Sequence, residues 1–144
     1  MAVKVKRIYE EAQDVDGTRV LVDRLWPRGV SKEKAALDAW LRELAPSDEL
    51  RQWFHSTPNG WLQFRKRYLK ELTRPEAAGE LTELYDLAGR RKRLTLLFAS
   101  KNEDQNNATV LRDLLEGMKK PPTGTGPGAA RGARVAKVRA MPKR

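Results

Sequence analysis

The chain contains no cysteine and only one histidine, His55, among its 144 residues. The absence of cysteine excludes disulfide bonds, thiol catalysis, iron–sulfur clusters and thiolate zinc sites. His55 lies near the end of a short predicted helix, where a surface position is a simpler interpretation than a general base. The only carboxylates that cluster usefully are Glu103 and Asp104, so we expect no metal site, and no cofactor is indicated.

Long apolar runs and nucleotide-binding glycine motifs are also missing. No window approaches the roughly 20 apolar residues that a membrane span needs. The first residues, MAVKVKRIYEE, hold no apolar run long enough for a signal peptide. Neither GxGxxG nor a Walker loop is present. We therefore expect a soluble, cytoplasmic protein without a membrane partner.

The positive charge is unevenly distributed. The net charge is +10, and residues 119–144 hold eight Lys and Arg but no Asp or Glu. Subtracting those eight leaves 21 basic against 19 acidic residues in 1–118, a net of +2. The segment is also rich in Pro, Gly and Ala and has no aromatic residue, so it cannot bury enough apolar surface to order itself. We expect one domain over 1–118 and a disordered basic tail over 119–144.

Three stretches have strand patterns. Residues 3–8 alternate apolar and polar side chains, whereas 18–22 and 94–99 are more continuously apolar, as buried strands are. The turn signal at 14–17 predicts that the first two strands form a hairpin or lie side by side. The two buried strands are separated by a mostly helical stretch, which predicts a parallel sheet.

Helical spacing of apolar residues predicts the elements around this sheet. The predicted helices cover residues 37–44, 48–54, 58–72, 77–88 and 110–115, and Ser47 is a plausible cap of the second. We assign Trp40, Trp53 and Trp61 to the core together with their aromatic neighbours. The expected fold is α/β, a small mostly parallel sheet flanked by helices, followed by the disordered C-terminal tail.

Several blocks of the sequence then resemble the YeaO-like family, domain of unknown function 488. They are RVLVDRLWPRG at 19–29, LAPS at 44–47, residues 50–54 and 64–68, and Asn106-Asn107-Ala108 with Leu111. The resemblance spans nearly all of residues 3–117, and it implies an α/β fold without implying a particular activity, cofactor or partner.

The chain departs from its relatives beside the paired asparagines. Related members often carry a histidine at the position of Gln105, and others have cysteine in this region. Imidazole or thiol chemistry at that place is therefore not available to this chain.

Two loops follow the buried strands, and ligands of parallel α/β sheets bind beyond the carboxyl ends of strands. Asn106 and Asn107 open a helix whose N-terminus favours anions, while arginine forks suit carboxylate or phosphate. We expect the loops to share one cleft and to bind a small anionic molecule. The candidate ligand-binding residues are Asp23, Arg24, Trp26, Arg28, Ser100, Lys101, Asn106 and Asn107.

A structural interpretation of the same residues is also open. Asp23 and Arg24 pair with each other in that interpretation, Trp26 and Pro27 pack as a lid on the core, and Asn106 is a helix cap. Lysines are generally solvated, so for Lys101 this interpretation is favoured.

Three functions remain open from the sequence. The first is a small-molecule enzyme or an anion-binding domain, with no catalytic residue identified. The second is a nucleic-acid-associated protein that binds weakly and without sequence preference through its basic tail. The third is an interaction module whose tail recruits an acidic partner. The cationic runs 65–67 and 90–93 are most simply solvated surface.

Overall fold

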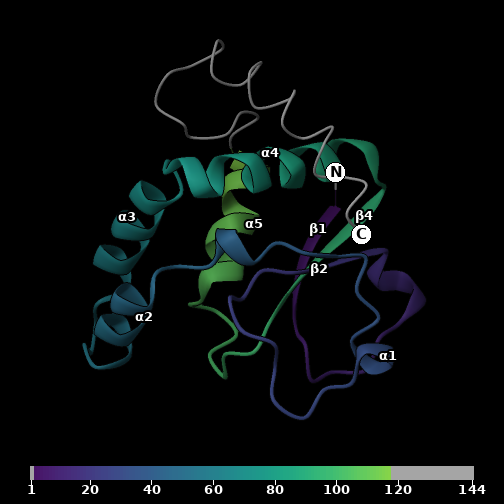
Figure 1. Cartoon of the computed structure of the whole chain (residues 1–144), viewed down its shortest axis with the longest axis horizontal. Helices are drawn as coiled ribbons and strands as arrows, with labels where there is room; N and C mark the ends of the chain where they lie inside the picture. The colour runs from purple at the N-terminus through teal and green to yellow at the C-terminus, as the bar shows by residue number, and fades with distance from the viewer. Residues whose placement is uncertain (1, 118–144) are drawn as a thin grey trace.

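In the computed structural model, which describes residues 2–117, one parallel sheet forms the centre of the molecule (Figure 1). Its strands are β1 (Ala2–Arg7), β2 (Thr18–Leu21), β3 (Ala39–Trp40) and β4 (Arg93–Phe98), in the order β1-β4-β2-β3. Every pairing in the sheet is parallel. The expected α/β fold is therefore confirmed, while the tail expected at 119–144 lies outside the described residues.

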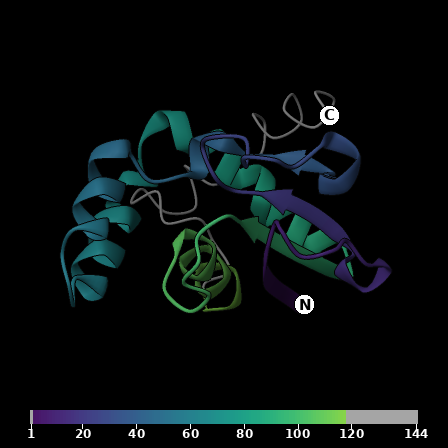
Figure 2. The ribbon, with the colours of Figure 1, turned by 90° about the horizontal axis from the view of Figure 1, so that it is seen from below.

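One face of the sheet is covered by α4 (Pro75–Arg90) and α5 (Asn107–Gly117) (Figure 2). Val3, Val20 and Leu96 point toward this face, because alternate residues of a strand share a side. They join a core that continues into α2 (Asp48–His55) and α3 (Trp61–Glu71), which lie side by side at one end of the molecule (Figure 1). None of the helices within residues 2–117 is long and apolar enough to cross a membrane.

The opposite face has no long helix over it among the described residues. A smaller cluster lies there, made of Ile8, Leu21, Ala35 and Leu97 with half-buried neighbours from the loops. The covering elements are the 3-10 turn η1 (Asp14–Asp16) and the one-turn helix α1 (Lys32–Ala35). Parallel sheets are normally covered by helices on both faces. Here loops and polar side chains cover the second face in their place.

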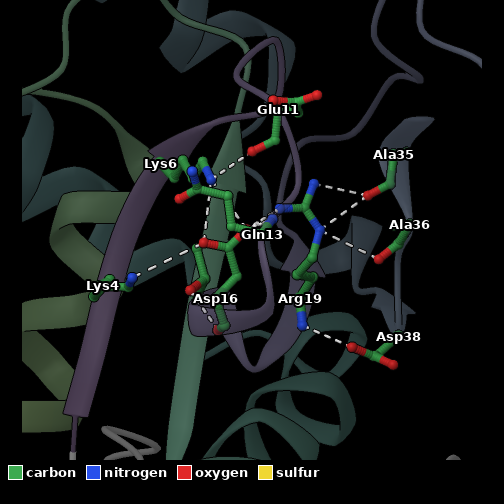
Figure 3. A network of polar contacts seen from close by, with 10 residues as sticks. Lys4, Lys6, Glu11, Gln13, Asp16, Arg19, Ala35, Ala36 and Asp38 are labelled. Atoms are coloured by element: carbon green, nitrogen blue, oxygen red, sulfur yellow. Dashed lines mark hydrogen bonds and ion pairs between the residues drawn. The ribbon is translucent and has the colours of Figure 1, made fainter.

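A polar network centred on Asp16 closes part of this second face (Figure 3). The Asp16 carboxylate, 1% exposed, accepts hydrogen bonds from Arg19 Nη1 at 2.5 Å, Lys6 Nζ at 3.0 Å and Gln13 N at 3.0 Å. Arg19 also donates to the carbonyls of Ala35 and Ala36. The buried charges are therefore paired, which is the condition for burying them at acceptable cost.

The expectation that the first two strands are neighbours is wrong. β4 lies between β1 and β2, and β2 runs parallel to β1. The turn at 14–17 does form, but it packs against the start of β4, where Thr95 Oγ1 donates to the Asp16 carbonyl at 2.7 Å. A turn signal fixes the local reversal of the chain and leaves the identity of the neighbouring strand to longer-range packing.

The helix expected at 37–44 is also wrong. The segment contains β3 and the 3-10 turn η2 (Arg42–Leu44), and Ala36 ends α1 in the left-handed conformation with φ 47°. Leu37 and Trp40 pack in the small cluster, whereas Leu41 and Leu44 pack in the main core. The helical spacing of these residues therefore reflects two separate burial sites. The other predicted helices are confirmed, with bounds that differ by a few residues.

Candidate functional site

The loops that follow β1, β2 and β4 leave from the same edge of the sheet, because these strands are parallel neighbours. Backbone hydrogen bonds continue past the strand ends, from Ile8 N to Phe98 O at 2.8 Å and from Val22 N to Leu97 O at 3.1 Å. The two loops singled out from the sequence are thus side by side, and the loop after β1 joins them.

Asp23 connects these loops. Its carboxylate accepts hydrogen bonds from Ala99 N at 2.9 Å and from Asn107 Nδ2 at 3.0 Å, and Asn107 Nδ2 also donates to Val22 O at 2.9 Å. Burial raises the pKa of Asp23, although the two hydrogen bonds and the charge of Arg51 oppose the rise. The end of β2, the end of β4 and the start of α5 are therefore fastened together by one carboxylate and one amide.

Asn106 acts as the cap of α5. Its side-chain oxygen accepts from Thr109 N at 3.0 Å, and Thr109 Oγ1 accepts from Asn106 N at 3.1 Å. The Asn106 amide nitrogen donates to Asn102 O at 2.7 Å. The Asn106 side chain thus satisfies one of the free N–H groups at the N-terminus of α5, and the Asp23 carboxylate lies beside that N-terminus.

Arg24 and Trp26 are turned toward the protein. Arg24 lies 3.6 Å from a Glu43 carboxylate oxygen and donates to Ala45 O at 3.4 Å, so its partner is not Asp23. Trp26 packs edge-on against Trp40 with ring centroids 5.4 Å apart, and its indole nitrogen donates to Val30 O at 2.7 Å. Trp26 thus holds the 23–30 loop against the small cluster, and Arg24 holds it against the 43–45 segment.

Arg28, Ser100 and Lys101 are exposed at this edge. Ser100 Oγ accepts from Asn102 N at 3.2 Å, and the Arg28 carbonyl accepts from the Tyr9 hydroxyl at 3.1 Å. Within residues 2–117 the charged groups of Arg28 and Lys101 have no ion-pair partner, so both are open to a ligand from solution.

Two further residues of this edge, Arg7 and Tyr9, were not predicted from the sequence. The Arg7 guanidinium donates to Ser100 O at 2.9 Å and to Ala99 O at 3.1 Å, and it lies 5.0 Å from the centre of the Tyr9 ring. A chain of contacts therefore runs from Arg28 through Tyr9 and Arg7 to the 100–101 loop. The sequence pattern concealed it because a hairpin would have put the end of β1 at the opposite edge.

Arg51 on α2 is a third missed residue, although its segment belongs to the family-like pattern. It is exposed, lies 3.5 Å from Asp48, and its charge opposes the rise that burial causes in the pKa of Asp23. Tyr68 is also buried near Asp23, and its hydroxyl donates to Leu44 O. Burial, together with the charges of Asp23 and Glu71, raises the pKa of Tyr68 well above its usual value, so this phenol stays protonated.

This arrangement provides cations and hydrogen-bond donors more readily than a reactive centre. Within residues 2–117 there is no group of three or more His, Asp and Glu residues that could hold a metal ion. His55 is exposed in the last turn of α2, as expected. Every buried polar side-chain atom of the described residues has a hydrogen-bond partner, so the inner part of the edge is a closed network.

Comparisons with known proteins place the chain in a family. The model of the inactive DUF488-N3 subclade matches residues 2–126. The uncharacterized protein YeaO of Escherichia coli is 46% identical over 118 residues, which cover 82% of this chain and all of the relative. Two mycobacterial proteins, Mb3100c of Mycobacterium bovis and Rv3073c of Mycobacterium tuberculosis, are each 41% identical over 115 residues, or 80% of this chain and 94% of theirs.

No solved structure matches the chain. The segment that the family model matches contains all the loops of the sheet edge described above. From the family model and the relatives together, the chain belongs to the YeaO-like proteins of the DUF488 family.

Proposed function

We propose that this chain binds a small anionic molecule at the carboxyl-terminal edge of its sheet. The observation that supports this most is the chain of contacts from Arg28 through Tyr9 and Arg7 to the loop that carries Lys101. Arg28 and Lys101 are exposed, and no acid within residues 2–117 forms an ion pair with either. Guanidinium and ammonium groups next to a half-exposed aromatic ring suit a carboxylate or phosphate that is attached to an apolar body.

The candidate residues divide into two groups with different roles in this proposal. Asp23, Asn106 and Asn107 hold the loops after β2 and β4 in position, and Arg24 and Trp26 fix the course of the 23–30 loop. The ligand contacts then belong to Arg28, Ser100 and Lys101, with Arg7 and Tyr9 beside them. Preorganised loops reduce the entropy that a ligand must otherwise overcome on binding.

Binding without turnover is the form of this proposal that agrees best with the comparisons. The matching family model is described as an inactive subclade. The half-buried Asp23 carboxylate already accepts two hydrogen bonds from the protein, and the only histidine lies on another element. A general base must face the substrate proton, whereas both carboxylate oxygens of Asp23 are directed at groups of the protein, Ala99 N and Asn107 Nδ2.

Thermal unfolding in the presence of anions tests the proposal. We expect inorganic phosphate, citrate or adenosine monophosphate to raise the melting temperature of the full chain by several degrees at saturating concentration, since a ligand that binds only the native state stabilises it. The double variant Arg28→Gln/Lys101→Gln should lose most of this shift. The matched control Arg91→Gln/Lys92→Gln removes the same charge from an exposed segment after α4 and should keep it.

Two results would contradict the proposal. One is a melting temperature that none of the three anions changes in the unmodified protein. The other is an equal loss of the shift in both double variants, because the stabilisation would then depend on total charge and not on the sheet edge.

A further inference from the structure

Helix α3 and its flanking turns carry an unusual concentration of positive charge. Residues 56–75 include the five cations Arg65, Lys66, Arg67, Lys70 and Arg74, but the only acid is Glu71. The described part of the chain is nearly neutral in total, so acids elsewhere compensate for this segment. The near-neutral sum therefore conceals a local basic region.

The single acid of α3 is directed inward. The Glu71 carboxylate accepts from Ser47 N at 2.8 Å and from Ser47 Oγ at 2.6 Å, which ties the end of α3 to the start of α2. Phe64 and Tyr68 are buried on the same inner side and fix the rotation of the helix. As a result, the outer side of α3 presents no carboxylate.

The outer side carries Lys66, Arg67 and Lys70, all of them exposed, and Arg74 follows just beyond the helix. Lys66 and Lys70 are four residues apart, so they lie on one line about 6 Å apart along the helix axis. The Arg67 guanidinium lies 4.4 Å from the centre of the Trp53 ring, which keeps this cation on the surface in a defined position. None of these outward cations has an ion-pair partner within residues 2–117.

A row of cations on a convex helix suits an extended polyanion better than a small ligand, which needs to be enclosed. Nucleic acid presents one phosphate charge per roughly 1.7 Å of duplex, and contacts to it release counterions. An anionic membrane surface has the same charge, but its binding gains from adjoining apolar side chains. Of the exposed large apolar residues of the described chain, only Leu62 lies beside these cations, next to Lys66, and the others (Tyr9, Val15, Leu25) lie elsewhere. The surface of α3 therefore offers a membrane little apolar area, which favours nucleic acid.

We propose that the outer face of α3 contacts the phosphate backbone of nucleic acid, without reading base sequence. The contact surface consists of Lys66, Arg67, Lys70 and Arg74 and shares no residue with the anion site at the sheet edge. It also differs from contact through residues 119–144, because it belongs to the folded part of the chain.

Equilibrium binding of the full chain to a fluorescent 30-base-pair DNA duplex, measured at several salt concentrations, tests this. The variant Lys66→Gln/Lys70→Gln removes two charges from α3. Its control, Arg91→Gln/Lys92→Gln, removes two exposed charges beyond the other end of α4, a helix about 24 Å long (Figure 1). Both proteins keep residues 119–144 and have the same net charge, so only the position of the lost charge differs.

We expect the α3 variant to bind roughly tenfold more weakly or worse at 50 mM salt, and its slope of log affinity against log salt to fall by about 2. The control should retain both values. Circular dichroism and melting temperature confirm that each variant is folded.

Three results would overturn the proposal. The first is that the unmodified protein fails to bind the duplex at low salt. The second is that the two variants lose affinity equally, and the third is that the α3 variant keeps its DNA affinity. In the last case, parallel measurements on phosphatidylserine vesicles show whether the same face serves a membrane instead.

Discussion

Asp16, Asp23 and Glu80 are carboxylates that the fold removes from water to different extents, with different consequences for stability. For Asp16 the effect of burial, which alone raises the pKa, is outweighed by hydrogen bonds from Gln13, Lys6 and Arg19, so the pKa is lowered. For Asp23 and Glu80 burial prevails and the pKa rises. A lowered pKa stabilises the native state at neutral pH, and a raised one destabilises it.

Replacing Glu80 with glutamine should stabilise the protein at alkaline pH. Burial, reinforced by the charges of Glu43 and Glu83, raises the pKa of Glu80 from 4.5 to about 7. The native state therefore holds an extra proton between these values, and stability is lost as the pH rises through that range. Chemical denaturation should find Glu80→Gln more stable than the unmodified protein by about 1–2 kcal/mol at pH 8, with little difference at pH 4.5.

In the unmodified protein Glu43 N donates to the Glu80 carboxylate at 2.8 Å. The side-chain amide oxygen that Glu80→Gln introduces can still accept this hydrogen bond, so the variant tests the charge alone. The explanation is wrong if the difference between the two proteins is the same at pH 4.5 and pH 8.

Removing the charge of Asp16 should destabilise the protein, in contrast to Glu80→Gln. In Asp16→Asn the charges of Lys6 and Arg19 lose their buried partner, which typically costs about 3–5 kcal/mol of unfolding free energy. Asp14→Asn changes an exposed carboxylate in the same turn and should stay within about 0.5 kcal/mol. In the unmodified protein the contribution of Asp16 is present above pH 3.8 and is lost as the pH falls through its lowered native pKa.

Urea denaturation at pH 7 compares the two variants. Equal stability of Asp16→Asn and Asp14→Asn would show that the network in Figure 3 contributes little.

At the scale of elements, the close approach of η1 to β4 depends on Gly17. This residue has φ 67°, and a Cβ placed on it would lie 2.6 Å from the carbonyl oxygen of Arg93. A side chain would therefore both strain the backbone and push the turn away from the strand that separates β1 from β2. The turn is compatible with this sheet order only because residue 17 has no side chain.

Two glycine-to-alanine variants should consequently change stability in opposite directions. We expect Gly17→Ala to lower the free energy of unfolding by about 2 kcal/mol or more. Gly79→Ala, in the middle of α4 with no atom within 4 Å of the new Cβ, should raise it by about 0.5–1 kcal/mol. Thermal denaturation measures both, and a neutral Gly17→Ala would indicate that η1 packs less tightly than described.

Most elements could be predicted because their signals are local. Ser47 caps α2 as expected, accepting from Leu50 N at 3.1 Å, and the apolar run at 94–98 is the buried central strand. β3 could not be predicted, since its two residues pair with Val20 and Leu21, which are distant in sequence. The apolar residues between 37 and 44 are spaced as in a helix, but Leu37 and Trp40 pack in the small cluster and Leu41 and Leu44 in the main core.

At the scale of the whole molecule, the main core joins the sheet to the α2–α3 pair without interruption. It runs from Val3 on β1 through Leu96 on β4 to Phe64 and Tyr68 on α3. Phe64 lies 4.4 Å from Phe54 between ring centroids and contacts Trp61 and Tyr68 as well. We therefore expect this part of the chain to unfold as one cooperative unit.

Phe64→Ala should test this cooperativity. We expect it to lower the free energy of unfolding by about 3–5 kcal/mol, whereas Leu62→Ala, at a residue 78% exposed on the same helix, should cost under about 0.5 kcal/mol. Tryptophan fluorescence and far-UV circular dichroism should give the same transition for Phe64→Ala, because the four tryptophans lie in both clusters. Separate transitions would mean that α2 and α3 unfold independently of the sheet.

For the candidate site, the sequence identified two of the three loops and missed the third. Asp23 was recognisable because it follows a buried strand, and Asn107 because it opens a helix. Arg7 and Tyr9 were not, because the edge at which β1 ends depends on whether β1 runs parallel to its neighbour. Strand direction is decided by pairing between segments that are 91 positions apart in sequence, Arg7 with Phe98, and no local pattern contains it.

The sequence by itself determined the segments that form β1, β2, β4 and most of the helices, where the caps lie, and which chemistries are excluded by the lack of cysteine. Only the tertiary structure decided that β4 enters between β1 and β2, that Asp23 is fastened to α5, and that α3 turns its one acid inward. The physical reason is the range of the interactions. Backbone propensity and burial periodicity act over a few residues, whereas neighbour choice, pairing of buried charges and orientation of a helix face depend on contacts between distant segments.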